Sequence, residues 1–402
     1  MNLRDTWYAW VRFLFEPASP LPMAIYRILY GLLVLAFCFL IGPDLHLWYG
    51  PDGVAPFPVA REWPEETLFD PLVLLPQTQE SISFTFALLV ASAICLTIGL
   101  FTRYSAILVL LSLLSFHHHN WLILNSGDTM MRIGALYLAL SHAGDALSVD
   151  RLVSVWTSRE VPAQKPPLKP PWAQRLLQLQ LAIIYCQAFF AKIAGEMWVN
   201  GSALYYTLRL EDFRRFYIAG LVGNTQLLTI LTWLSLAVEF SLFTLVWFRD
   251  LRYWVLAAGI IFHISIDILM NLPLFEYLMI IAFVSFIYPE DLTRAMNASK
   301  SFLERKLGPP SLVIYDGSSH RGKRVAETIR RIDIFGRLLL VNYKLDAATA
   351  HWSRLLHEDV LKESVYVRHR GTWLQGNSAW QFIVARLMLI PEEKPQPEPE
   401  KA

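Results

Sequence analysis

The 402-residue chain is 54% apolar and only 17% charged, with a mean hydropathy of +0.37. Soluble domains usually contain about 25% charged residues, so this composition argues against an ordinary soluble enzyme. The charge is uneven, because 28 of the last 102 residues are charged and only 41 of the first 300. We therefore expect a membrane region followed by a soluble domain. The net charge of +1 gives no indication of a nucleic-acid partner.

The first 21 residues place Trp7, Trp10 and Leu14 at helical spacing, which predicts a helix in the membrane interface. Residues 22–290 contain eight apolar segments, each near the roughly 20 residues that cross a bilayer. These segments are 22–42, 83–101, 104–123, 129–143, 174–195, 226–248, 253–271 and 274–289. The predicted fold class is therefore a polytopic α-helical membrane protein with about eight transmembrane helices in the lipid bilayer.

Two connections between the segments are long. Residues 43–82 are rich in turn formers and predict an ordered outer loop, and the proline-rich residues 159–173 predict an extended inner linker. Lys and Arg are enriched in cytoplasmic loops. With a cytoplasmic N-terminus, the inner loops carry nine of these residues and the outer loops four. We therefore expect both termini in the cytoplasm and the protein in a bacterial inner membrane.

Seven ionisable residues fall inside the predicted spans. Lipid solvates charges poorly, so such residues indicate either a functional site or ion pairs that hold the helices together. Three are cations, three are carboxylates and one is a histidine, and this balance leaves both interpretations open. The residues are Arg27, Arg132, Lys192, Glu239, His263, Asp267 and Glu276.

Lys192 is the strongest candidate for chemistry. Gln178, Tyr185 and Lys192 are seven residues apart and share one helix face, which predicts a polar stripe along a cavity. A desolvated lysine loses its proton easily and can act as a base. The alternative is a lysine that extends to the outer membrane surface. Since His263 and Asp267 are four residues apart, we expect this carboxylate to orient the imidazole.

The sequence predicts no metal site. Consecutive residues of a helix point in different directions, so the run of His117, His118 and His119 makes a poor metal cage and is expected to form a polar cap at the interface. The three cysteines lie far apart and show neither zinc spacing nor a disulfide framework.

Five motifs in order along residues 5–290 resemble the HTTM (horizontally transferred transmembrane) proteins, which are relatives of the vitamin K-dependent gamma-carboxylase. Arg27 lies in the first of these motifs, Asn125, Asp128 and Arg132 in the third, Lys192 and Trp198 in the fourth, and His263, Asp267 and Glu276 in the fifth. The motifs are SPLPMAIYRILYGLL, LWYGPDGVAPFP, NSGDTMMRIGALYLAL, QLAIIYCQAFFAKIAGEMWVNGSALYY and FHISIDILMNLPLFEYLMI.

The resemblance implies a specific chemistry. Lys192 matches the carboxylase lysine that deprotonates reduced vitamin K, which then reacts with molecular oxygen. This chain has one lysine instead of a pair, its tryptophan lies six residues on instead of five, and its NSGD motif lacks the histidine of the carboxylase. The chain is also too short for the large carboxylase domain, so glutamate carboxylation is not expected. The resemblance thus implies a cavity for a reduced quinone or a similar lipophilic molecule.

We expect Lys192 and His263 to be the catalytic residues of this site. The expected cavity or ligand-binding residues are Arg27, Asn125, Asp128, Arg132, Gln178, Tyr185, Trp198, Glu239, Asp267 and Glu276.

The last quarter of the chain predicts a small α/β domain after a linker at 291–310. Strands at 311–317 and 337–343 flank a basic helix at 321–333, with a hairpin and a helix following up to residue 390. The stretch YDGSSHRG resembles the YDGxCxxC motif of DCC thiol-disulfide oxidoreductases, which implies a thioredoxin-like fold. Ser319 and Gly322 replace both cysteines, so thiol chemistry is not expected. A binding or scaffold role with a protein partner remains, and residues 391–402 are expected to be disordered.

Three hypotheses of function follow. The first is an oxidoreductase or epoxidase that acts on a reduced quinone with Lys192 as base. The second is a transporter of a small lipophilic ligand that uses the same cavity. The third is a non-catalytic membrane partner, such as an immunity or assembly factor, that docks through its C-terminal domain.

Overall fold

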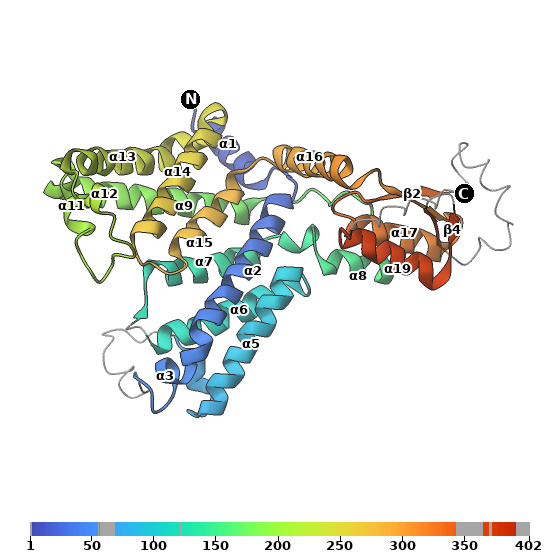
Figure 1. Ribbon diagram of the computed structural model, residues 1–402, viewed down its shortest axis with the longest axis horizontal. Coiled ribbons are helices and arrows are strands. Elements are labelled where there is room, and N and C mark those ends of the chain that lie inside the picture. Colours follow the sequence, from blue (N-terminus) through green and yellow to red (C-terminus); the bar gives the residue numbers. More distant parts are fainter. Residues whose placement is uncertain are drawn as a thin grey trace, which may run out of the picture. The chain divides into compact units, whose positions relative to one another are not determined.

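The computed structural model of the protein describes residues 2–54, 56, 69–120, 123–342, 365–369 and 372–390, and these residues are mostly helical (Figure 1). The chain divides into two compact units. The membrane unit comprises Met1–Asp150 and Pro167–Tyr288, and the C-terminal unit comprises Arg151–Pro166 and Pro289–Ala402. The boundary between the units falls within the proline-rich linker, of which residues 159–166 belong to the C-terminal unit and residues 167–173 to the membrane unit.

Each of the eight predicted spans contains a helix. Five helical runs are long and apolar enough to cross a membrane: Leu21–Tyr49, Gln79–Ile98, Trp172–Ile193, Thr225–Trp247 and Arg249–Leu269. These runs contain α2 (Leu21–Ile41), η1 (Gly42–Asp44), α3 (Leu45–Tyr49), α5 (Gln79–Ile98), α9 (Trp172–Ile193), α13 (Thr225–Thr244), η5 (Leu245–Trp247) and α14 (Arg249–Leu269).

The other three predicted spans form shorter or more polar helices. They are α6 (Thr102–His119), α7 (Ser126–Leu140) and α15 (Phe275–Ala282), which η6 (Phe283–Phe286) extends. At about 1.5 Å per residue, α7 is about 22 Å long and the α15–η6 run about 18 Å, whereas the bilayer core is about 30 Å thick. The chain is thus a membrane protein with five candidate spans, and eight crossings stay a prediction.

Short helices connect the long ones. They are η2 (Pro71–Leu74), η4 (Ala143–Asp145), α8 (Val149–Thr157), α10 (Glu196–Val199), α11 (Ala203–Thr207) and α12 (Ala219–Val222). Part of the predicted outer loop at 43–82 lies outside the described residues.

The predicted interfacial helix is α1 (Leu3–Phe15). None of its residues is buried, and Leu3 and Trp7 expose most of their surface. The guanidinium of Arg175 lies 4.8 Å from the centre of the Phe13 ring, and its Nε donates a hydrogen bond to the Phe13 carbonyl. An exposed apolar face beside a cation is typical of a helix on a membrane surface.

Helix α2 packs against α5, α7 and α15 (Figure 1). Glycines allow two of these approaches. A Cβ on Gly31 would lie 2.2 Å from Thr97 Oγ1 of α5, and one on Gly134 of α7 would lie 2.6 Å from the Tyr26 hydroxyl. Close approach of helices at small residues such as glycine is typical of helix packing in membranes.

The C-terminal unit contains a four-stranded sheet in the order β2-β1-β3-β4. Strand β1 (Ser311–Tyr315) pairs in parallel with β2 (Leu338–Asn342) and antiparallel with β3 (Tyr366–His369), which pairs antiparallel with β4 (Thr372–Leu374). Helix α17 (His320–Ile332) connects β1 to β2, and α19 (Gly376–Leu387) follows β4. This order confirms a small α/β unit, while the thioredoxin-like assignment stays a prediction.

The segment predicted as a linker, 291–310, is instead mostly helical. Helix α16 (Pro289–Leu307) carries Glu290 and Asp291 in its first turn and Arg305 and Lys306 in its last. Acidic residues at the N-terminus and basic residues at the C-terminus stabilise a helix through its dipole. The predicted disordered tail at 391–402 lies outside the described residues.

Candidate functional site

Helix α9 presents Gln178, Tyr185 and Lys192 on one face as predicted, but each side chain has a different partner. The Gln178 side-chain amide donates to the carbonyl of Ser285, 2.5 Å away, and Gln174 donates to the same carbonyl at 2.7 Å. Gln178 therefore joins α9 to η6. Since this side chain is only 2% exposed, its hydrogen bond satisfies a buried amide in the helix packing.

Lys192 forms an ion pair with Glu239 of α13. The side chain of Lys192 is 26% exposed and that of Glu239 only 4%. The lysine Nζ also lies 4.8 Å from the centre of the Trp198 ring, a cation–π contact. This is the geometry of a structural ion pair, and proton abstraction by Lys192 requires the pair to separate.

His263 lies at the centre of a buried hydrogen-bonded chain. Its Nδ1 contacts the carboxylate of Glu276 on α15, and its Nε2 lies 2.6 Å from the hydroxyl oxygen of Tyr185. All three residues are at most 4% exposed. Such a chain can pass a proton between a tyrosine hydroxyl, an imidazole and a carboxylate.

The predicted pairing of His263 with Asp267 is wrong. Asp267 instead accepts hydrogen bonds from Arg215 at 3.1 Å and from the Tyr277 hydroxyl at 2.8 Å. Glu276, which orients the imidazole instead, lies after the break between α14 and α15, so no helical periodicity in the sequence links it to His263.

Arg27 and Arg132 do not pair with the carboxylates of the other spans. Arg27 is fully buried and donates to the carbonyls of Ala143, at 3.3 Å, and Leu147, at 2.6 Å. Arg132 donates to the Thr129 hydroxyl at 3.1 Å. Arg27 thus satisfies backbone carbonyls of the turn after α7, which is a structural role.

Asn125 and Asp128 form the capping box of α7. The side chain of Asn125 accepts from the amide of Gly127 at 2.6 Å, and the Asp128 carboxylate accepts from the Asn125 amide at 2.8 Å. This reciprocal arrangement satisfies amides that the first turn of a helix leaves unpaired. It also places both side chains at the wall of a cavity.

This cavity of about 290 Å³ lies between α2, α3, α6, α7 and the start of α15. Most of its wall is apolar. The polar lining residues are His117, Asn125 and Asp128, and Trp48 and Tyr49 are aromatic residues that each carry one polar group. Of the predicted cavity residues, only Asn125 and Asp128 line this cavity. The apolar lining is Phe37, Leu40, Ile41, Ile123, Leu124, Met131, Pro273, Leu274, Phe275 and Leu278.

His117 is the residue that the sequence interpretation missed. It is 2% exposed, and its Nε2 lies 3.5 Å from Asp128 Oδ1, too far for a good hydrogen bond. Neither ring nitrogen forms a hydrogen bond with any described residue. A buried polar group of this kind needs a partner, which a ligand or a water molecule can supply. The prediction that the histidine run is only an interfacial cap is therefore wrong for His117.

Metal binding has no support among the described residues, where no group of three potential ligands comes together. The three histidines contact different groups, and His117 lies nearest to Asp128. His118 Nδ1 lies 2.6 Å from the carbonyl of Phe69, whereas His119 faces Asp70 at 3.6 Å.

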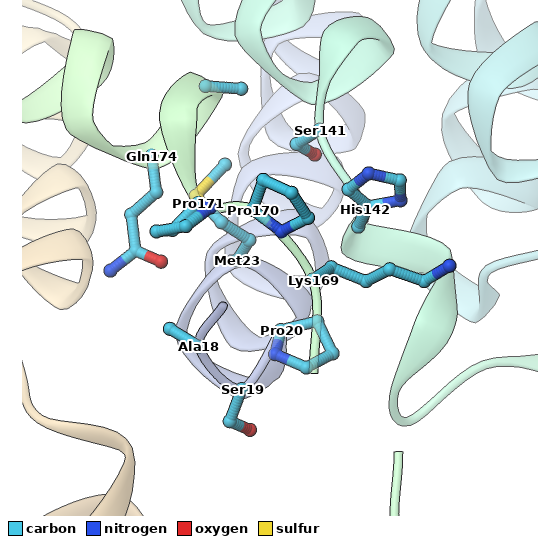
Figure 2. A pocket seen from close by; sticks show the side chains of 11 residues that line it. Ala18, Ser19, Pro20, Met23, Ser141, His142, Lys169, Pro170, Pro171 and Gln174 are labelled. Atoms are coloured by element: carbon cyan, nitrogen blue, oxygen red, sulfur yellow. The ribbon is translucent and has the colours of Figure 1, made fainter. Parts of the chain in front are cut away.

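Figure 2 shows a second pocket, of about 20 Å³, where the segment before α2 meets the segment before α9. Ala18 and Lys169 form an antiparallel bridge here, with both N···O distances at 2.9 Å. The labelled side chains of His142 and Lys169 lie on one side of this bridge (Figure 2). The volume fits about one water molecule, so this pocket is too small for a quinol-sized ligand.

Comparison with known proteins identifies a family for the membrane unit. Residues 15–291 match the HTTM domain, which is more than half of the chain and ends before the C-terminal sheet. No curated protein and no solved structure matches the chain.

Proposed function

The chain belongs to the HTTM family, and we propose that its membrane unit binds a small lipophilic molecule of the quinol type and removes a proton from it. The observation that carries this proposal is the apolar cavity lined by His117, whose ring nitrogens have no hydrogen-bond partner among the described residues. Its volume of about 290 Å³ is roughly twice the 150 Å³ that binds benzene in an engineered protein core. A substituted aromatic ring is therefore a suitable occupant.

His117 and Asp128 supply the polar end of this site. A neutral imidazole can accept a hydrogen bond, and then a proton, from a ligand hydroxyl. Asp128 beside Nε2 stabilises the imidazolium that this transfer produces. The apolar wall packs against the ring and excludes water, and the aromatic side chain of Trp48 adds a surface on which the ring can stack.

Helix α15 relates the cavity to the second buried cluster. Phe275 lines the cavity, and its ring centre lies 6.4 Å from that of His263. The next residue, Glu276, contacts His263, which in turn lies within hydrogen-bond distance of Tyr185. In this proposal the chain of Glu276, His263 and Tyr185 supports proton movement near the ligand, while Lys192 and Glu239 stabilise the neighbouring helices.

The resemblance to the carboxylase supplies the remaining chemistry. A deprotonated quinol is readily oxidised, and molecular oxygen would be the electron acceptor, as an oxidoreductase or epoxidase requires. Glutamate carboxylation is not part of the proposal.

Quinol binding by the full-length protein in mild detergent tests this function. The wild-type protein should retain a radiolabelled menaquinol analogue in the cavity that Trp48 lines. Met131→Trp, which fills the cavity, and His117→Phe, which removes its polar group, should each weaken binding by about tenfold or more. Leu32→Trp is the matched control, because Leu32 is an exposed residue of α2 outside the cavity lining. Unchanged binding in both cavity variants would refute the proposal.

A transporter of the same ligand is the second candidate function. It is favoured by the short α15, which begins after Leu274 in a left-handed conformation (φ 62°) and borders the cavity. Interrupted helices beside a binding site are typical of secondary transporters. Uptake of the labelled quinol into proteoliposomes without its oxidation would favour this alternative.

A further inference from the structure

Helix α17 carries two arginines whose hydrogen bonds go to segment 151–166, which comprises most of α8 and the start of the proline-rich linker. Arg324 Nη1 donates to the carbonyl of Trp156 and Nη2 to that of Ser158, each at 2.8 Å. These carbonyls lie at the end of α8, where the helix itself offers no amide partner. Arg324 therefore caps the C-terminus of α8 with a positive charge, which the helix dipole favours.

Arg331 is more extensively bonded. Its Nε donates to Glu327 at 2.9 Å, which fixes the direction of the guanidinium. Nη1 donates to the carbonyl of Arg151, and Nη2 donates to the carbonyls of Pro162 and Ala163 at 3.0 and 3.2 Å. The side chain is only 7% exposed, so this charge is buried against segment 151–166. Charge-assisted hydrogen bonds are about twice as strong as neutral ones.

The segment is chemically suited to this helix. Arginine has only donors, and segment 151–166 supplies acceptors, because the last carbonyls of α8 have no intrahelical partner and the turn that follows keeps its carbonyls free of a helix ladder. The segment also contributes one donor of its own, because Trp156 Nε1 bonds to the hydroxyl of Thr328 at 3.0 Å. Within the segment, Arg151 donates to the carbonyls of Ala163 and Gln164, both at 3.0 Å, which closes the loop into a compact shape.

The residues directly before and after the segment form hydrogen bonds within the membrane unit. Just before it, the Asp150 carboxylate accepts from the amides of Phe101 and Thr102 at 2.7 and 2.9 Å, which caps the start of α6. Just after it, Lys169 pairs with Ala18. The segment is thus the covalent connection between α7 and α9.

We propose that helix α17 is an intramolecular clamp, whose Arg324 and Arg331 face holds the chain's own segment 151–166 within the C-terminal unit. This proposal goes beyond the quinol site and does not rest on it. It gives a structural task to a unit that lacks the cysteines of the redox family it resembles. It also means that this face is occupied by the chain itself, so a partner protein can use it only by displacing the segment.

Hydrogen–deuterium exchange of the full-length protein in detergent tests the clamp. In the double variant Arg324→Ala/Arg331→Ala, the amides of 151–158 should exchange about tenfold faster or more, because the capping bonds are lost. The matched control is Arg321→Ala/Lys323→Ala, which removes two exposed cations of the same helix. The control should leave exchange in 151–158 unchanged.

The amides of β1 distinguish local release from unfolding of the whole unit. An equal rise of exchange in 312–314 would mean that the double variant unfolds the whole unit. In that case the milder Trp156→Phe variant tests the clamp, since it removes only the bond to Thr328. That variant should raise exchange in 151–158 by about fivefold with β1 unchanged. The clamp is refuted if 151–158 exchanges as in the wild type in the double variant, or if Trp156→Phe has no effect where the double variant unfolds the unit.

Discussion

Replacing Lys192 with methionine separates a structural ion pair from a catalytic base. The two partners are unequally buried, since the side chain of Lys192 is 26% exposed and that of Glu239 only 4%. Lys192→Met therefore leaves a carboxylate in an apolar environment, and Glu239 Oε2 already has no hydrogen bond to a described residue. Breaking a buried pair in this way typically costs about 3–5 kcal/mol. We expect about 3 kcal/mol, because water screens the exposed lysine end.

The reverse change should be milder. Glu239→Gln leaves the lysine, which is partly exposed and keeps its contact with the Trp198 ring. We expect this variant to lose about 1 to 2 kcal/mol, and Lys192→Met/Glu239→Gln to recover about 2 kcal/mol relative to the sum of the single variants. At about 2 °C per kcal/mol, the melting temperature should fall by about 6 °C in Lys192→Met and about 3 °C in Glu239→Gln.

Thermal unfolding of the purified protein in detergent measures these values, together with quinol oxidation at a temperature where every variant is folded. Gln187→Met is the matched control, because it replaces an exposed polar residue of the same helix with methionine. If Lys192→Met melts with the wild type while quinol oxidation is abolished, the structural interpretation is refuted and Lys192 is the base.

Three further predictions concern the turn after α7, the YDGSSHRG motif at the start of α17 and the topology. Arg27→Met should destabilise the protein by about 3 kcal/mol in the same thermal assay, because it leaves two buried carbonyls without their charged donor. Ser319→Cys/Gly322→Cys should destabilise the C-terminal unit, since a Cβ on Gly322 would lie 2.1 Å from the Asp316 carbonyl oxygen. The variant should therefore not reduce insulin, and insulin reduction above background would contradict this prediction. Single cysteines in place of the exposed Leu74 and Lys306 should be labelled from opposite sides of the membrane, and labelling from one side would contradict the eight-span arrangement.

Most helices and strands of this protein follow from local patterns in its sequence, with α16 as an exception. Runs of about 20 apolar residues can satisfy their backbone only as helices in lipid, so the segments are readable without tertiary information. The same holds for β1, α17 and β2, whose strand, amphipathic helix and strand follow from local patterns. The shared face of Gln178, Tyr185 and Lys192 also follows from helical periodicity alone. Ser319 caps α17, because its hydroxyl accepts a hydrogen bond from the Gly322 amide at 2.9 Å. A serine directly before a helix is a typical N-cap.

The contacts between these residues could not be read from local sequence patterns. Glu276, rather than the neighbouring Asp267, contacts His263, because the chain bends between α14 and α15 and returns a carboxylate to the imidazole. Helix packing likewise placed the cavity around His117, at the ends of α6 and α7 and not beside Lys192. Helical periodicity specifies the direction in which a side chain leaves its own helix axis. The partners of that side chain depend on how separate helices pack, and this packing is set by contacts between residues distant in sequence.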